Sequence, residues 1–169
     1  MKKNTKEQRK CNINLRILSD FLDKKMQWRY AREEFQGRYH LVGDVVGGKR
    51  NIQRYSFKFD ILDEGVFSIA AYPFIVPETR TKDICELVVR INNKMWDGKF
   101  DYIIDRGKIQ FRLFQDFDLQ QSQIMSRLTR FVNLPILILN RFLDSFEDVL
   151  NKKSSPSEAI KKGLFPNAG

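Results

Sequence analysis

The sequence predicts an α+β domain in which helices flank an antiparallel β-sheet, in the order αβββαββα. Two observations support this prediction. Segments in which apolar and polar residues alternate are joined by short turns, as in antiparallel hairpins. Segments with apolar residues three and four positions apart, typical of helices with one buried face, lie before, between and after them. At 169 residues the chain has the length of one domain, and this arrangement of elements is typical of the α+β class.

The first half of the chain contains one predicted helix and three predicted strands. The helix covers residues 12–26, where apolar residues recur on one face. The strands cover residues 39–46, 54–62 and 66–72. The second strand has the clearest alternation, which predicts one buried and one solvated face. Its apolar residues are Tyr55, Phe57, Phe59 and Ile61.

A helix and a hairpin follow between Pro77 and Leu113. Pro77 suits the first turn of a helix, because its missing N–H would have no partner there. The apolar period then changes from helical to alternating at residue 99, and Gly107 in the hairpin turn is expected to have a positive φ. The apolar stripe of the predicted helix consists of Ile84, Leu87, Val88, Ile91 and Met95.

The last predicted elements are a long helix over residues 120–150 and a short terminal helix over residues 157–163. Pro135 lies inside the long helix and is expected to kink it or divide it in two. We therefore expect a single domain over residues 12–163. Residues 1–11 are expected to form a disordered basic arm and residues 164–169 a flexible tail.

Three segments resemble a known family: PFIVPETR, ELVVRINN and GKFDYIIDRGKIQFR. They are similar to the YbjN family of bacterial proteins, described as sensory transduction regulators, in which a "vp…r" helix start precedes an "el…riN" helix and a "G.f.yd..dG.i.fr" hairpin. The resemblance is strongest over residues 72–113 and extends more weakly over residues 15–160. It implies a YbjN-like domain with a fold similar to type III secretion chaperones. It implies no activity and no catalytic residue.

The cysteine content and the expected lack of export and membrane segments indicate a cytoplasmic protein. The formal net charge is +9, and the excess lies at both ends of the chain and in the first strands. No run of 18 apolar residues is present, so no transmembrane helix is expected. The N-terminus lacks the apolar segment that a signal peptide needs. Two cysteines, Cys11 and Cys85, fit a reducing compartment.

No set of residues predicts catalysis, a cofactor or a metal site. Residues 43–49 satisfy the pattern GxxxxGK, but Arg50 stands where a P-loop needs Ser or Thr, and a strand follows where a P-loop needs a helix. His40 is the only histidine, which is too few for a zinc site with two distant cysteines. Three aspartates around the hairpin have the wrong spacing for an EF-hand, namely Asp97, Asp101 and Asp105.

The most apolar stretch of the chain covers residues 131–143. One interpretation is a helix packed across the sheet. The other is an exposed surface that binds a protein partner or a second copy, because secretion chaperones of the resembled fold dimerise and bind partner segments. In that second interpretation the candidate partner-binding residues are Phe131, Leu134, Ile136, Leu137, Leu139 and Phe142.

These observations lead to one functional hypothesis and one alternative. We expect a non-enzymatic protein-interaction module, chaperone-like or regulatory, that binds an unknown protein partner and forms a homodimer. The alternative is a nucleic-acid-binding protein that uses its basic N- and C-terminal segments, because cationic side chains bind the phosphates of any sequence.

Overall fold

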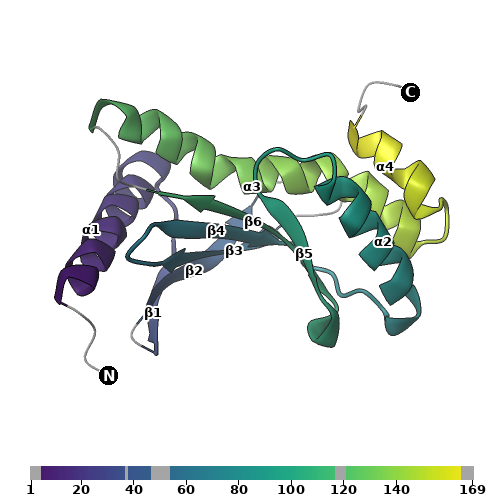
Figure 1. Ribbon diagram of the computed structural model, residues 1–169, viewed down its shortest axis with the longest axis horizontal. Coiled ribbons are helices and arrows are strands. Elements are labelled where there is room, and N and C mark those ends of the chain that lie inside the picture. Colours follow the sequence, from purple (N-terminus) through teal and green to yellow (C-terminus); the bar gives the residue numbers. More distant parts are fainter. Residues whose placement is uncertain (1–4, 37, 47–53, 117–120, 165–169) are drawn as a thin grey trace.

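The computed structural model describes residues 5–36, 38–46, 54–116 and 121–164. Within these residues the chain forms one six-stranded antiparallel sheet and four α-helices (Figure 1). The strands are β1 (Ala31–Phe35), β2 (Arg38–Val46), β3 (Arg54–Ile61), β4 (Val66–Ala71), β5 (Lys99–Ile103) and β6 (Lys108–Gln115). The α-helices are α1 (Thr5–Phe21), α2 (Thr81–Asn92), α3 (Gln121–Leu150) and α4 (Pro156–Leu164). Three short helical turns are η1 (Leu22–Met26), η2 (Glu78–Arg80) and η3 (Ile104–Arg106).

The spatial order of the strands is β1-β2-β3-β4-β6-β5, and each neighbouring pair is antiparallel. Strands β1 to β4 form a meander. The chain then leaves the sheet through α2 and returns as the β5–β6 hairpin, whose second strand pairs with β4. The predicted α+β class is therefore confirmed, with β1 and β5 as the two edge strands.

The sheet has four strands before α2, whereas the predicted order αβββαββα has three. The additional strand is β1, whose five residues are all exposed. An edge strand has a neighbour on one side only, and this one buries neither face, so its sequence AREEF carries no apolar alternation. The observed order is αββββαββαα.

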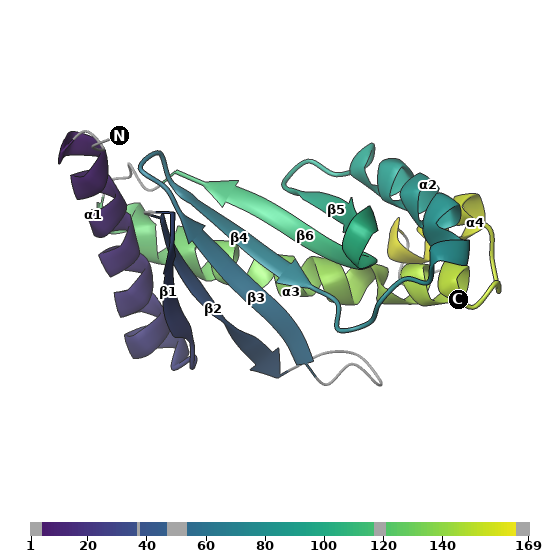
Figure 2. The same cartoon turned by 90° about the horizontal axis from the view of Figure 1, so that it is seen from below.

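Helix α3 runs along one face of the sheet, from the side where α1 lies to the side where α2 and α4 lie (Figure 1). The view from below shows β2, β3, β4 and β6 in front of α3 (Figure 2). The core has two parts on this helix-covered face. One lies between α1, the middle strands and the first half of α3. The other lies between α2, α4, the strands β4 to β6 and the second half of α3.

Several predicted local features are confirmed. The alternating residues Tyr55, Phe57, Phe59 and Ile61 of β3 are buried, as are Ile84, Leu87, Val88 and Ile91 of α2. Gly107 has a φ of 58° in the β5–β6 turn.

Helix α3 continues without a break through the buried Pro135, so this proline does not divide it.

Both ends of the described chain are more helical than expected. Residues 5–11 of the expected arm 1–11 belong to α1, and Cys11 is buried with its Sγ 3.6 Å from the carbonyl oxygen of Ile61. Of the expected tail 164–169, Leu164 belongs to α4, and the other residues lie outside the described part of the chain. Helix α4 begins at Pro156.

Candidate functional site

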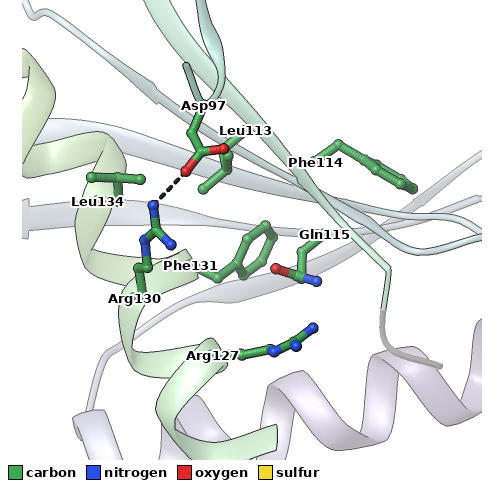
Figure 3. Close-up of a pocket in the computed structure, with 8 residues that line it drawn as sticks. All are labelled: Asp97, Leu113, Phe114, Gln115, Arg127, Arg130, Phe131 and Leu134. Carbon is green, nitrogen blue, oxygen red and sulfur yellow. Dashed lines mark hydrogen bonds and ion pairs between the residues drawn. The ribbon is translucent and has the colours of Figure 1, made fainter. Parts of the chain in front are cut away.

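A cavity of about 280 Å³ lies between the end of β6 and the first half of α3 (Figure 3). Strand β6 contributes three consecutive residues, α3 contributes one side of two helical turns, and the turn after α2 contributes an aspartate. The lining residues are Asp97, Leu113, Phe114, Gln115, Arg127, Arg130, Phe131 and Leu134.

The cavity exists because β5 is shorter than β6. The pairing of the two strands begins at Lys99, which lies opposite Arg112. Residues 113–115 continue β6 and still pair with β4, although β5 does not extend beside them. Helix α3 passes along this uncovered edge, and the space between them is the β6–α3 cavity.

The floor of the β6–α3 cavity is apolar and its rim is polar. Phe131 is buried, and its ring centroid lies 6.0 Å from that of Phe59 in the core. Leu113 and Leu134 are half-buried. On the rim, the guanidinium of Arg130 forms an ion pair with Asp97, which bridges α3 and the turn after α2 (Figure 3). The two side chains remain 69% and 52% exposed.

The turn at residues 93–98 carries a fully exposed tryptophan, Trp96, directly before Asp97. This turn is held against β6 at Gly98, which has a φ of 69°. A Cβ at this position would lie 2.3 Å from the Phe111 ring and 2.7 Å from the Arg112 carbonyl oxygen. The close approach therefore requires glycine and fixes where the turn places Trp96 and Asp97.

The six predicted partner-binding residues do not share one exposed surface. Three of them, Phe131, Leu139 and Phe142, are buried in the core, while Leu134 and Ile136 are half-buried and Leu137 is 61% exposed. The β6–α3 cavity brings together two of the six, Phe131 and Leu134. Leu137 follows Leu134 by three residues, so the two lie on the same side of α3.

Sequence reasoning missed Trp96, Arg130 and their relation to the cavity. Trp96 lies beyond the apolar stripe of α2, so helical periodicity does not say whether its side chain is buried. Arg130 and Asp97 are 33 residues apart and meet only through the packing of α3 on the sheet. The one local signal was the Asp97-Gly98 pair, because such a dipeptide marks a turn.

The other residues singled out in the sequence are engaged elsewhere. His40 is buried on β2, with its Nδ1 2.6 Å from Oδ1 of Asp60, and Lys58 lies 2.8 Å from the same oxygen. Asp101 forms ion pairs with Lys99 and Arg112. Of the GxxxxGK motif, residues 43–46 belong to β2, and residues 47–49 lie outside the described part of the chain. Among the described residues no group of three or more His, Cys, Asp or Glu could hold a metal ion.

A second hollow, of about 380 Å³, lies between α1, η1 and the start of α3. It is lined by Ile17, Asp20, Phe21, Lys24, Lys25, Met125 and Leu128. On its rim, Lys24 and Asp20 form an ion pair at 3.1 Å. It contains none of the predicted partner-binding residues, so the β6–α3 cavity is the stronger candidate.

Comparison with known proteins identifies a family. Residues 27–148 match the model of the family YbjN, described as "Putative bacterial sensory transduction regulator". The matched segment includes the six strands, α2, most of α3 and every residue that lines the β6–α3 cavity. No curated protein and no solved structure shows significant similarity to the chain. In the part of the chain that the structure describes, no helix is long and apolar enough to cross a membrane.

Proposed function

Because the chain belongs to the YbjN family, whose description is that of a bacterial sensory transduction regulator, we propose that it is a non-enzymatic regulatory module of the cytoplasm that binds another protein at the β6–α3 cavity. The family match confirms the resemblance that three sequence segments predicted. A regulator acts by changing what another molecule does, which requires a surface that recognises that molecule.

The observation that carries this proposal is the full exposure of Trp96, which directly precedes Asp97, a lining residue of a cavity with an apolar floor. Tryptophan and arginine are enriched among the residues that dominate protein–protein binding energy, and they act best at the centre of a patch that excludes water. A fully exposed indole is costly in water, and covering it by a partner would recover that free energy. Trp96 and Arg130 together therefore support a protein-binding role.

The proposed binding region, here called the Trp96–Arg130 surface, consists of exposed or half-buried residues that line the cavity or lie within three positions of a lining residue in the sequence. It combines apolar and charged side chains, as the core and rim of a protein interface do. Two of the predicted partner-binding residues on α3, Leu134 and Leu137, belong to this surface. A third, Phe131, is buried and forms part of the cavity floor. The members are Trp96, Asp97, Phe114, Arg130, Leu134 and Leu137.

The test compares proteins retained by the tagged full-length chain with those retained by three variants. Trp96→Ala and Arg130→Ala remove two anchors of the surface. Phe35→Ala is the matched control, because Phe35 is 65% exposed and lies on β1, at the opposite edge of the sheet from β5. The capture is repeated after nuclease treatment and at high salt.

We expect specific proteins to be retained by the wild-type chain and by Phe35→Ala, and to be lost with Trp96→Ala. With the purified partner, Trp96→Ala should weaken the affinity about tenfold or more. Retention that Trp96→Ala and Arg130→Ala leave unchanged would contradict the proposal. Retention that nuclease or salt abolishes would favour the alternative, nucleic-acid binding through the basic terminal segments.

A further inference from the structure

The first half of α3 is hollowed on two different sides. Arg130 and Leu134, four residues apart, line the β6–α3 cavity. Met125 and Leu128, three residues apart, line the second hollow, where α3 begins beside α1 (Figure 1). This second hollow, here called the α1–α3 hollow, shares no lining residue with the cavity. Its volume of about 380 Å³ is within the range of small-molecule sites.

The α1–α3 hollow has an apolar inner wall. Phe21 and Leu128 are almost fully buried, at 3% and 2% exposure, and belong to one core cluster. Ile17 is half-buried against the same cluster. Met125 is 51% exposed, and its flexible thioether side chain can adapt to the shape of an apolar ligand. An apolar chain that enters the hollow would therefore be removed from water.

The charged side chains of the hollow favour an anion. Lys24 and Lys25 lie on η1, and both are exposed. Lys24 is paired with Asp20 at 3.1 Å. Lys25 forms no ion pair with any other described residue, so its ammonium group is available to a ligand. The segment of residues 5–26 has six Lys and Arg residues and three acidic residues, and its field attracts anions as well.

The two lysines lie on an unusual backbone. The η1 segment is a turn of π-helix, after which Gln27 has a left-handed φ of 53°. Turns of π-helix are rare and are found frequently at functional sites. A positive φ is uncommon for a residue with a side chain. This local structure is a second observation, independent of the shape of the hollow, that supports a binding role for the segment.

We propose that the α1–α3 hollow binds a single-chain amphiphile with an anionic head group, such as a fatty carboxylate. The apolar chain packs on Phe21, Leu128 and Met125, and the carboxylate lies beside the ammonium group of Lys25. The hydrophobic effect favours burial of the chain, and the ammonium donates a charge-assisted hydrogen bond to the head group. This site does not depend on the proposed function, because the two sites share no lining residue.

Isothermal titration calorimetry of the full-length chain with four probes tests the class of ligand. Decanoate has the apolar chain and the anionic head group. Decanol keeps the chain without the charge, decylammonium reverses the charge, and acetate keeps the charge without the chain. All are used below the concentrations at which they form micelles. We expect decanoate to bind most tightly, followed by decanol and then decylammonium, and we expect acetate not to bind.

Three variants separate the contribution of the head group from that of the chain. Lys25→Glu should weaken decanoate binding about tenfold and leave decanol binding unchanged. Met125→Gln replaces the thioether by an amide of similar length and should weaken both probes to the same degree. Asp20→Asn releases Lys24 from its ion pair and should strengthen decanoate binding about threefold, a gain that no folding defect can produce.

The matched control is Lys82→Glu, because Lys82 is exposed on α2, at the opposite end of the sheet from α1 (Figure 1). This variant should bind decanoate with the affinity of the wild-type chain. Circular dichroism checks that every variant is folded. A rise in melting temperature with decanoate is the second measure of binding, since a ligand that binds the folded chain stabilises it.

Three outcomes would overturn the inference: no binding of decanoate by either measure, decylammonium that binds as tightly as decanoate, or Lys25→Glu and Met125→Gln variants that both bind decanoate like the wild type. Flotation with vesicles of anionic lipid distinguishes a membrane surface from a single chain. Binding to vesicles without binding of free decanoate would also overturn the inference.

The proposed function fails separately, because its readout is the capture of a partner protein by Trp96→Ala. Decanoate binding that Lys25→Glu abolishes, together with a partner that Trp96→Ala still retains, would support the amphiphile site and contradict the partner site. A partner lost with Trp96→Ala, in a wild-type chain that does not bind decanoate, would do the reverse.

Discussion

The side-chain amide of Asn92 makes two hydrogen bonds to the backbone of Phe100. Its Nδ2 donates to the Phe100 carbonyl at 2.9 Å, and its Oδ1 accepts from the Phe100 N–H at 2.8 Å. Phe100 lies on the edge strand β5, so Asn92 supplies the pairing that a further strand would otherwise provide. Asn92 also ends α2, and the contact therefore fixes both ends of the turn that carries Trp96 and Asp97.

We predict that Asn92→Asp lowers the free energy of unfolding by about 1–3 kcal/mol. A carboxylate can still accept from the Phe100 N–H, but it cannot donate to the carbonyl, and the two oxygens would repel each other. Urea denaturation measures the change. Asn93→Asp is the control, because Asn93 is exposed and follows Asn92 directly. Equal stability of the two variants would mean that the paired hydrogen bonds do not hold the turn.

Burial raises the pKa of Tyr55 to about 12, and the negative charge of Glu147 adds to this rise. The Tyr55 hydroxyl donates to Oδ1 of Asn140 at 2.7 Å. The folded-state pKa lies above the ordinary value of 10.0, so ionisation favours the unfolded chain. The stability that this residue contributes is complete below pH 10 and is lost as the pH rises from 10 towards 12.

We therefore predict that Tyr55→Phe flattens the dependence of the unfolding free energy on pH above pH 10. Some dependence remains in this variant, because burial also raises the pKa of Tyr72 well above its ordinary value. The double variant Tyr55→Phe with Tyr72→Phe should remove more of the pH dependence of the unfolding free energy. Urea denaturation at several values between pH 9 and pH 11.5 measures the slope, and curves parallel to the wild type would contradict the assignment.

Gly163 of α4 packs directly against the ring of Phe142 on α3. A Cβ at position 163 would lie 2.1 Å from Cδ1 of Phe142, well inside van der Waals contact. We predict that Gly163→Ala destabilises the protein by about 1–3 kcal/mol because the two helices must move apart. At an exposed helical position the same change would stabilise the protein.

Thermal unfolding compares Gly163→Ala with Lys161→Ala, a change at an exposed position of the same helix. Combining Gly163→Ala with Phe142→Leu should cost less than the sum of the two single changes, because the smaller side chain makes room. The result also tests whether α4, which lies beyond the family match at residues 27–148, belongs to the same cooperative unit. Additive effects would show that the two positions do not share a contact.

The sequence by itself determined those elements whose signal is local. Tyr55, Phe57, Phe59 and Ile61 alternate because one face of β3 is buried, and the α2 stripe recurs at helical spacing for the same reason. Gly107 occupies a turn that requires a positive φ. Each of these patterns is complete within about ten residues, so it can be read without knowing what packs against it.

Only the tertiary structure decided the edge strand β1 and the candidate site. Strand β1 is exposed on both faces and is defined by its pairing with β2, so its own residues carry no period. The β6–α3 cavity depends on where the β5–β6 pairing stops and on the path of α3 past residues 113–115. Asp97 and Arg130 meet across 33 residues, and Trp96 is exposed because no described element packs over it. Such contacts follow from the register and packing of distant elements, which local periodicity does not specify.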